Sequence, residues 1–304
     1  MKKLLTAVTA LALLFLSACS LEPPEWAKPK KENGKEIKIG LSVSTLKNPF
    51  FVSLKNGVVN EAKKRGIKVI VVDAQDDSAK QTNDVEDLLQ QGVDALLINP
   101  ADSSAISTAV QSANSLGIPV VTLDRSAEKG KVETLVASDN VKGGQMAAGY
   151  IVEQLGKSAK VAELEGVPGA SATRERGSGF HKTADEKLDV IAKQTADFDR
   201  TKGLNVMENL LQGNPDIQAV FAHNDEMALG AIEAIRSSGK DILVVGFDGN
   251  EDAIKAVKAG EMAATIAQQP ELIGKLAVQA AQDILNGKKV DKTIPAPLKL
   301  EKSK

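Results

Sequence analysis

Side chains that can bind hydroxyl groups recur where apolar runs of this sequence end. Carboxylates accept hydrogen bonds from hydroxyls, arginine guanidiniums donate them in a fixed fork, and planar amides do both. Aromatic rings beside them can cover the C–H faces of a ring-shaped ligand. This combination of side chains matches the chemistry of a sugar. The residues concerned are Ser44, Asn48, Asp124, Arg125, Arg174, Arg176, Phe198, Asn224, Asp225, Asp248 and Gln268.

One of these run ends, residues 44–51, reads Ser-Thr-Leu-Lys-Asn-Pro-Phe-Phe and places two of the seven phenylalanines side by side, at Phe50 and Phe51. The apolar residues 37–43 before it predict a buried strand, and Pro49 is typical of a first helical position. In an open α/β sheet, ligands bind beyond the carboxyl ends of the strands. A single phenylalanine here would be explained by core packing, whereas the pair favours a stacking surface for an apolar ligand face.

Short β-branched runs alternate with helical stretches through the rest of the chain, which indicates parallel sheets with helices on both sides. The runs form two similar series, and we therefore predict an α/β fold of two doubly wound parallel-sheet lobes joined by crossover strands. A ligand between such lobes would meet the carboxyl ends of both sheets. The first series is residues 37–43, 67–73, 95–99 and 119–124, and the second is residues 159–166, 189–196, 217–222 and 242–247.

The chain is expected to pass between the lobes three times, near residues 138–140, 268–270 and 297–300. One lobe would then comprise residues 36–138 plus 269–297, and the other residues 139–268 plus 298–304.

The first residues have the pattern of an export signal: Lys2 and Lys3, an apolar run over residues 4–16, and small residues before Cys19. Residues 16–19, Leu-Ser-Ala-Cys, resemble the lipobox of bacterial lipoproteins, in which the cysteine carries a diacylglycerol. Cys19 is the only cysteine, so it cannot form an internal disulfide. We predict a signal peptide over residues 1–18, and a lipidated N-terminus with a Pro- and Lys-rich disordered tether over residues 19–35. The protein would then be anchored at the outer face of the cell membrane.

Composition argues against several other classes of function. The 38 basic and 40 acidic residues are mixed along the chain, which argues against a nucleic-acid partner. The only histidines, His181 and His223, have no neighbour at metal-ligand spacing, so we expect no metal, no cofactor and no enzymatic activity.

Asp124 and Asp248 could in principle act as the paired carboxylates of a glycosidase. Against this, the arginines predicted around Asp124 should keep it ionised and unable to act as an acid. A carboxylate after a strand is also often a helix N-cap, and Asp225, which precedes Glu226, fits that role better than Asn224 does.

The motifs at these run ends, in their order and spacing, resemble those of the bacterial ribose-binding proteins, the extracytoplasmic receptors of ribose ABC importers. The resemblance extends over residues 37–300. It is carried by residues 44–51 together with Thr-Leu-Asp-Arg (122–125), Arg-Glu-Arg-Gly (174–177), Ala-Asp-Phe-Asp-Arg (196–200), Asn-Asp-Glu-Met-Ala-Leu-Gly (224–230), Gly-Phe-Asp-Gly (246–249) and Thr-Ile-Ala-Gln (265–268).

This resemblance implies a type I periplasmic-binding-protein fold that closes like a Venus flytrap on D-ribose, with phenylalanines on the two faces of the sugar ring. Its partners would be the permease subunits of an ABC transporter and, as an open possibility, a chemotaxis receptor; we expect a monomer. Arg174 is left with a structural role. Lys47 and His223 depart from the family pattern beside contact positions, without touching the pocket. The implied ligand-binding residues are Ser44, Asn48, Phe50, Phe51, Asp124, Arg125, Arg176, Phe198, Asn224, Asp248 and Gln268.

Three alternatives remain beside this hypothesis. The same receptor could serve allose, xylose, galactose or a furanosyl signalling sugar. A sugar-responsive transcriptional regulator of related fold would need a basic helix-turn-helix at the N-terminus, where this chain has a signal and lipobox. The glycosidase is the third alternative.

Overall fold

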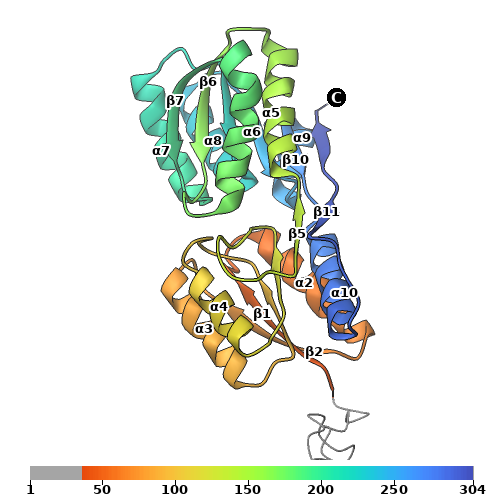
Figure 1. Ribbon diagram of the computed structural model, residues 1–304. Coiled ribbons are helices and arrows are strands. Elements are labelled where there is room, and N and C mark those ends of the chain that lie inside the picture. The colour runs from red at the N-terminus through yellow and green to blue at the C-terminus, as the bar shows by residue number, and fades with distance from the viewer. Residues whose placement is uncertain (1–35, 304) are drawn as a thin grey trace, which may run out of the picture. The chain divides into compact units, whose positions relative to one another are not determined.

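The computed structural model describes residues 36–303 of the 304-residue chain. These residues form two six-stranded sheets, each flanked by helices (Figure 1). The predicted signal peptide, Cys19 and the tether lie outside the described residues. Among residues 36–303, no helix combines the length and the apolar character that crossing a bilayer requires.

The first sheet is parallel throughout, with the strand order β11-β5-β4-β3-β1-β2. Helices α2 and α10 pack on one face and α3 and α4 on the other, because their apolar residues join two separate core clusters. This sheet and its helices are the first lobe. Its elements are β1 (Lys38–Val43), α2 (Pro49–Lys64), β2 (Lys68–Asp73), α3 (Ser78–Gln90), β3 (Ala95–Ile98), α4 (Ser107–Ser115), β4 (Val120–Leu123), β5 (Thr134–Ser138), α10 (Pro270–Leu285) and β11 (Thr293–Ala296).

The second sheet has the order β12-β10-β9-β8-β6-β7, and only its edge strand β12 runs antiparallel, against β10. Helices α5 and α6 cover one face, and α7, α8 and α9 cover the other. This is the second lobe. Its elements are α5 (Asn140–Leu155), β6 (Lys160–Glu165), α6 (Ser171–Lys187), β7 (Asp189–Thr195), α7 (Arg200–Gly213), β8 (Ala219–Ala222), α8 (Asp225–Ser238), β9 (Leu243–Asp248), α9 (Glu251–Ala259), β10 (Ala264–Ala267) and β12 (Lys299–Lys302).

The predicted fold class, two doubly wound lobes joined by crossover segments, is confirmed. The chain leaves the first sheet after Ser138, returns to the first lobe between β10 and α10, and joins the second sheet again at β12. The residue boundaries of the lobes given above stay a prediction. Strands β5, β10 and β11 were not identified as strands from the sequence.

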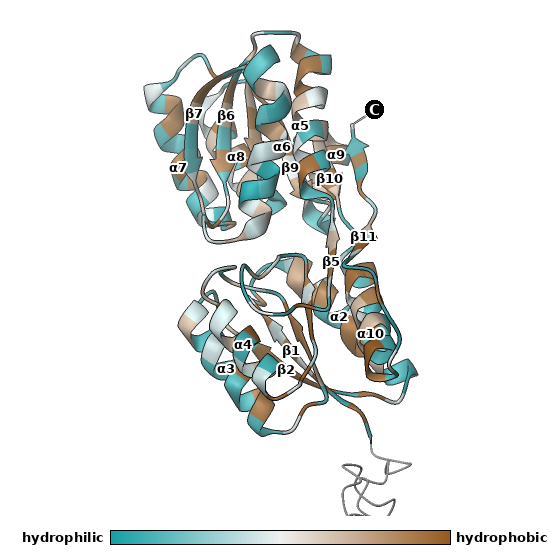
Figure 2. Ribbon diagram, viewed as in Figure 1, coloured by the Kyte–Doolittle hydropathy of each residue, from teal (hydrophilic) through white to brown (hydrophobic). Residues whose placement is uncertain are grey.

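Burial of apolar side chains explains the layers. Strands β3, β4 and β8 are buried along their whole length, as expected for strands covered on both faces. Figure 2 shows the same pattern, with hydrophobic colour on the strands and along α10. The polar residues buried beside this core lie mainly where strands end, and these positions build the site.

Candidate functional site: a cavity between the two sheets

A small cavity lies where the carboxyl ends of strands from both sheets meet, and we call it the inner cavity. All the predicted ligand-binding residues except Ser44 and Gln268 line it. Ala172, in the first turn of α6, also lines it and was missed, because a small apolar side chain carries no chemical signal in a sequence. The lining residues are Asn48, Phe50, Phe51, Asp124, Arg125, Ala172, Arg176, Phe198, Asn224 and Asp248.

The start of α2 holds the two phenylalanines in place. Asn48 caps this helix by accepting a hydrogen bond from the Phe50 N–H at 2.9 Å, and Pro49 occupies the first helical turn as predicted. The rings of Phe50 and Phe51 meet edge to face with centroids 5.2 Å apart. Both rings also belong to the apolar core beneath α2. The pair therefore closes the top of the core and lines the inner cavity at the same time.

Asp124 and Asp248 occupy matching positions, at the carboxyl ends of β4 and β9. Both have positive backbone φ angles, 63° and 124°, which are costly for residues other than glycine. Both are nearly fully buried. Each sheet therefore presents one carboxyl group to the inner cavity from a strained strand end.

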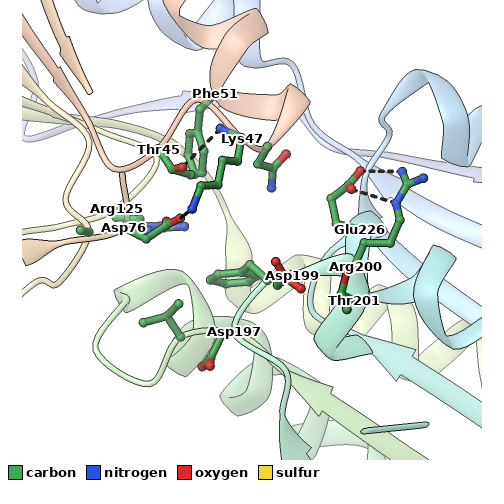
Figure 3. A pocket seen from close by; sticks show the side chains of 14 residues that line it. Thr45, Lys47, Phe51, Asp76, Arg125, Asp197, Asp199, Arg200, Thr201 and Glu226 are labelled. Atoms are coloured by element: carbon green, nitrogen blue, oxygen red, sulfur yellow. Dashed lines mark hydrogen bonds and ion pairs between the residues drawn. The ribbon is translucent and has the colours of Figure 1, made fainter. Parts of the chain in front are cut away.

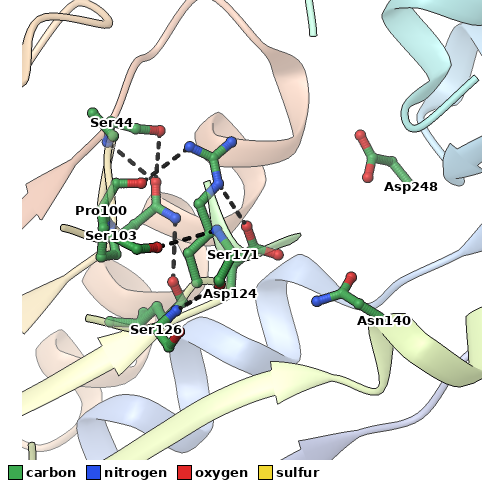
Figure 4. Close-up of polar contacts among 12 residues, drawn as sticks. Ser44, Pro100, Ser103, Asp124, Ser126, Asn140, Ser171 and Asp248 are labelled. Atoms are coloured by element: carbon green, nitrogen blue, oxygen red, sulfur yellow. Dashed lines mark hydrogen bonds and ion pairs between the residues drawn. The ribbon is translucent and has the colours of Figure 1, made fainter. Parts of the chain in front are cut away.

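Arg125 connects the two lobes through aromatic rings. Its guanidinium carbon lies 5.0 Å from the Phe51 centroid and 5.1 Å from the Phe198 centroid, and these rings come from different lobes. Its Nη1 donates to the carbonyl oxygen of Pro100 at 3.0 Å, and its Nε lies 3.6 Å from Asp124 Oδ2 (Figure 4).

Arg176 is the second buried guanidinium of the cavity. Its Nε donates to Asn140 Oδ1 at 2.9 Å, and its Nη1 donates to the carbonyl oxygen of His223 at 2.6 Å. The guanidinium carbon lies 3.8 Å from the Phe247 centroid, and Nη1 is 3.6 Å from Asp248 Oδ1. His223 thus contacts a cavity residue through its backbone carbonyl oxygen, and it is not among the residues that line the inner cavity.

Burial dominates the electrostatics of the two carboxyl groups. It raises the pKa of Asp124 above its ordinary value, although Arg125 and Arg176 act in the opposite direction. It also raises the pKa of Asp248 well above the ordinary value, against the effect of Arg176 and with that of Asp225. The two arginines therefore favour the ionised form of Asp124 as expected, but desolvation outweighs their effect on its pKa; the ionised state of Asp124 stays a prediction.

Two of these buried groups retain unused hydrogen-bonding capacity among the described residues. Asp124 Oδ1 and Arg125 Nε have no hydrogen-bond partner there. Unpaired buried polar atoms are costly, so sites that keep them are candidates for ligand contacts. Here one atom accepts and the other donates, which suits a ligand that can do both, such as a hydroxyl.

The two remaining predicted residues support the cavity from behind. Ser44 donates its hydroxyl to Asn99 Oδ1 at 2.7 Å, within the first lobe. Gln268 donates from Nε2 to Asp248 Oδ1 at 2.9 Å and so holds the second carboxyl group in position. Arg174 does not line the cavity: it donates to backbone oxygens of residues 168 and 169 and pairs with Glu128.

The prediction that Asp225 would fit the N-cap role better than Asn224 was wrong for α8. Asn224 is the N-cap, accepting from the Met227 N–H at 2.9 Å, while its Nδ2 donates to the carbonyl oxygen of Phe198. Asp225 is buried instead and accepts hydrogen bonds from the Thr265 hydroxyl and the Asn250 N–H, both at 2.7 Å. Burial raises the pKa of Asp225 to about 7.

A wider hollow of about 710 Å³ opens outside the inner cavity, sharing Asn48, Phe51, Arg125 and Phe198 with it. Charged pairs line it, including Lys47 with Asp76 from the first lobe and Arg200 with Glu226 from the second (Figure 3). Lys47, which departs from the family pattern, therefore lies at the mouth of the site. Within residues 36–303, no group of three or more side chains is suited to hold a metal ion.

Two lobes with one polar, aromatic-lined cavity between their strand ends define a periplasmic-type solute-binding protein. The periplasmic binding protein domain model matches residues 39–289, and the chain belongs to this family. It is 75% identical to the ribose import binding protein of Bacillus subtilis (strain 168), over the full length of both chains. It is 52% identical to the ribose import binding protein of Escherichia coli (strain K12), covering 99% of this chain and 98% of the relative.

The fold also matches solved structures. The Caulobacter myo-inositol binding protein, bound to myo-inositol, aligns with a TM-score of 0.85 and 32% identity over 89% of this chain and 94% of that one. The resemblance noted in the sequence is confirmed. The relatives are binding proteins, and the prediction that this chain is not an enzyme is confirmed by them.

Asp225 should make the stability of the second lobe depend on pH. Its pKa is about 7 in the folded protein and 3.8 ordinarily, so between these pH values the folded state binds more protons than the unfolded state. Its contribution to stability must then fall as the pH rises through this window. We expect the free energy of unfolding of the wild type, minus that of Asp225→Asn, to decrease by roughly 2 to 4 kcal/mol from pH 3.8 to pH 7.

Urea unfolding at a series of pH values measures this difference. The matched control is Asp252→Asn, an exposed carboxylate on α9. A difference that stays constant with pH for Asp225→Asn would contradict the raised pKa.

Proposed function

We propose that this protein is an extracytoplasmic receptor that captures D-ribose between its two lobes and delivers it to the permease of an ABC importer. The observation that carries the proposal is the inner cavity, whose buried lining of two carboxyl groups, two guanidiniums and two amides beside phenylalanine rings matches a small polyol. The names of the full-length relatives support ribose as that ligand.

Each part of the lining has a role in this proposal. Asp124 and Asp248 accept hydrogen bonds from sugar hydroxyls, and Arg125 and Arg176 donate to ring or hydroxyl oxygens. Asn48 and Asn224 each use the amide oxygen as a helix cap. Asn48 offers its Nδ2 to the ligand side, and Asn224, whose Nδ2 also donates to the Phe198 carbonyl oxygen, offers the second N–H of that group. Phe51 and Phe198 come from different lobes and cover the apolar faces of the sugar ring.

Specificity follows from the same lining. The alternatives are allose, xylose, galactose and furanosyl sugars, which differ from ribopyranose in size or in hydroxyl placement. An inverted hydroxyl leaves a buried partner unpaired, which costs about 1 to 3 kcal/mol per group. A larger sugar must also fit between the phenylalanine rings that line the inner cavity.

Binding tests this proposal. We expect ribose to bind one to one to the soluble domain, from about residue 35 onward, with higher affinity than allose, xylose, galactose or glucose. Arg176→Ala and Asp248→Ala should each weaken binding by about 10- to 150-fold, because a hydrogen bond to a charged group contributes roughly 1.5 to 3 kcal/mol. Isothermal titration calorimetry measures both effects.

The control for these variants is Arg236→Ala, an exposed arginine of the same lobe, whose affinity for ribose should match that of the wild type. Binding of another sugar but not of ribose would keep the receptor class and change the assigned ligand. No detectable binding of any of these sugars would refute the proposed site.

Closure of the two lobes on the sugar is the proposed mechanism. A ligand that contacts residues of both lobes only in the closed state shifts the population towards that state. The three segments that join the lobes form the hinge, and the closed form is the one that the permease recognises.

Small-angle X-ray scattering provides the check on closure. The radius of gyration should decrease when ribose saturates the wild type, and Asp248→Ala should show no decrease at the same sugar concentration. An unchanged radius of gyration in a ribose-saturated wild type rules out hinge closure.

We also propose that Cys19 carries the diacylglycerol anchor and that the receptor acts as a monomer at the outer face of the membrane. Two acyl chains give stable attachment, where one is marginal. In cells that process lipoproteins, we expect wild-type protein in the membrane fraction and Cys19→Ser protein outside it. Equal membrane association of both, measured by fractionation and immunoblotting, argues against the anchor.

A further inference from the structure

Arg176 owes its direction to residues that lie outside the inner cavity. A long guanidinium side chain has several accessible rotamers, so a binding site needs neighbours that fix it. The Phe247 ring lies against the guanidinium, and the His223 carbonyl oxygen accepts from Nη1. Its Nε donates a hydrogen bond to Asn140 Oδ1.

Asn140 is the first residue of α5, immediately after the segment in which the chain crosses from β5 into the second lobe. It is 2% exposed and does not line the inner cavity. The helix is capped by the neighbouring Asp139, whose side chain accepts from the Lys142 N–H. The Asn140 amide is therefore not needed as a helix cap.

Both ends of this amide are used, and their partners fix its orientation. Oδ1 accepts from Arg176 Nε at 2.9 Å, and Nδ2 donates to Glu175 Oε2 at 2.9 Å. The reverse orientation would set an amide N–H against a guanidinium N–H and an amide oxygen against a carboxylate. Glu175 thus orients Asn140, and Asn140 in turn orients Arg176.

The position of Asp248 explains why this contact matters. Arg176 Nη1 already lies 3.6 Å from Asp248 Oδ1 in the buried site. Without the Asn140 acceptor, Arg176 Nε would lose its hydrogen bond, and the nearest compensation is a closer ion pair with Asp248. Such a pair would use the two charged groups on each other instead of on a ligand.

We propose that Asn140 is a positioning residue of the sugar site: with Glu175 behind it, it holds Arg176 by Nε and keeps its guanidinium available beside Asp248. The proposal builds on the ribose-binding function proposed above. It also links the site to the hinge, since the residue that positions Arg176 begins the helix that follows the crossover strand.

A double-mutant cycle tests whether Glu175 orients Asn140 and whether Asn140 in turn orients Arg176. Asn140→Ala should weaken ribose binding at least 10-fold. Asn140→Asp keeps an acceptor for Arg176 but sets a second carboxylate against Glu175, and should weaken binding similarly at about pH 8. The double variant Asn140→Asp/Glu175→Gln reverses the hydrogen bond, because a glutamine amide can donate to the new carboxylate. Its affinity should return to within about 3-fold of that of Glu175→Gln alone.

The pH profile separates positioning from a general structural effect. Burial raises the pKa of Glu175, and a second carboxylate would raise it further. As the pH falls, Glu175 protonates and can donate to the aspartate of Asn140→Asp. The affinity of this variant, relative to the wild type at each pH, should therefore rise as the pH is lowered, and the double variant should show no such rise. Asn205→Asp, on the exposed face of α7, is the control for added charge.

A second measurement needs no sugar. The Nε–H resonance of Arg176 in ¹⁵N-edited NMR, assigned by its loss in Arg176→Lys, should be protected from solvent exchange in the wild type. This protection should be lost in Asn140→Ala and retained in the double variant. Equal protection in Asn140→Ala, or no rescue in the double variant, overturns the proposal. If the wild type binds no sugar, the proposed function fails, and the Nε–H signal still decides whether Asn140 holds Arg176.

Discussion

The burial of four charged side chains in one small space is the constraint on which the site depends. Asp124, Arg125, Arg176 and Asp248 are each at most 5% exposed. Removing charged groups from water is expensive unless they are paired or hydrogen-bonded. The contacts that they make are incomplete, at 3.6 Å within each Asp–Arg pair, and burial raises the pKa of both carboxyl groups. Hydrogen bonds to other residues hold these groups in place: Arg125 donates to Pro100, Arg176 donates to Asn140 and His223, and Asp248 accepts from Gln268.

Each lobe contributes the same three kinds of group to the cavity: a carboxyl group at a strained strand end, a guanidinium and a phenylalanine ring. In the first lobe they are Asp124, Arg125 and Phe51, and in the second they are Asp248, Arg176 and Phe198. The match is chemical and not exact in position, since Arg125 follows its strand directly whereas Arg176 lies on α6. Two lobes of similar design thus present similar groups to the inner cavity.

The sequence was sufficient for the fold class and for most of the cavity, because both are encoded locally. Strands buried on both faces read as continuous apolar runs, and most of the groups that face the cavity lie within a few residues of their carboxyl ends; Arg176, on α6, is an exception. Strand β11 was missed because it contains Pro295, which normally argues against a strand, and it is tolerated here at the edge of the sheet. Strands β5 and β10 were also missed, and length does not explain this, because β3, β4 and β8 were identified and are equally short.

The remaining differences come from tertiary contacts. Asn224 and Asp225 are adjacent and both can cap a helix, and only the burial of Asp225 against Thr265 decides between them. The pKa of Asp124 depends on how much water reaches it, which no local pattern reports. Asn140 gave no signal at all, because its partner Arg176 lies 36 residues further along the chain.

The insertion of the second lobe into the first has a consequence for the growing polypeptide. Helix α10 contributes Ile273, Ala277 and Val278 to the same core as Ile39 and Leu41 of β1. The buried residues of the two core clusters of the second lobe all lie between residues 147 and 266. A chain made from its N-terminus therefore contains every residue of those two clusters before α10 exists. The first lobe, whose first strands are synthesised earliest, is therefore the lobe that receives the last fully buried residues of its core, up to Ala296.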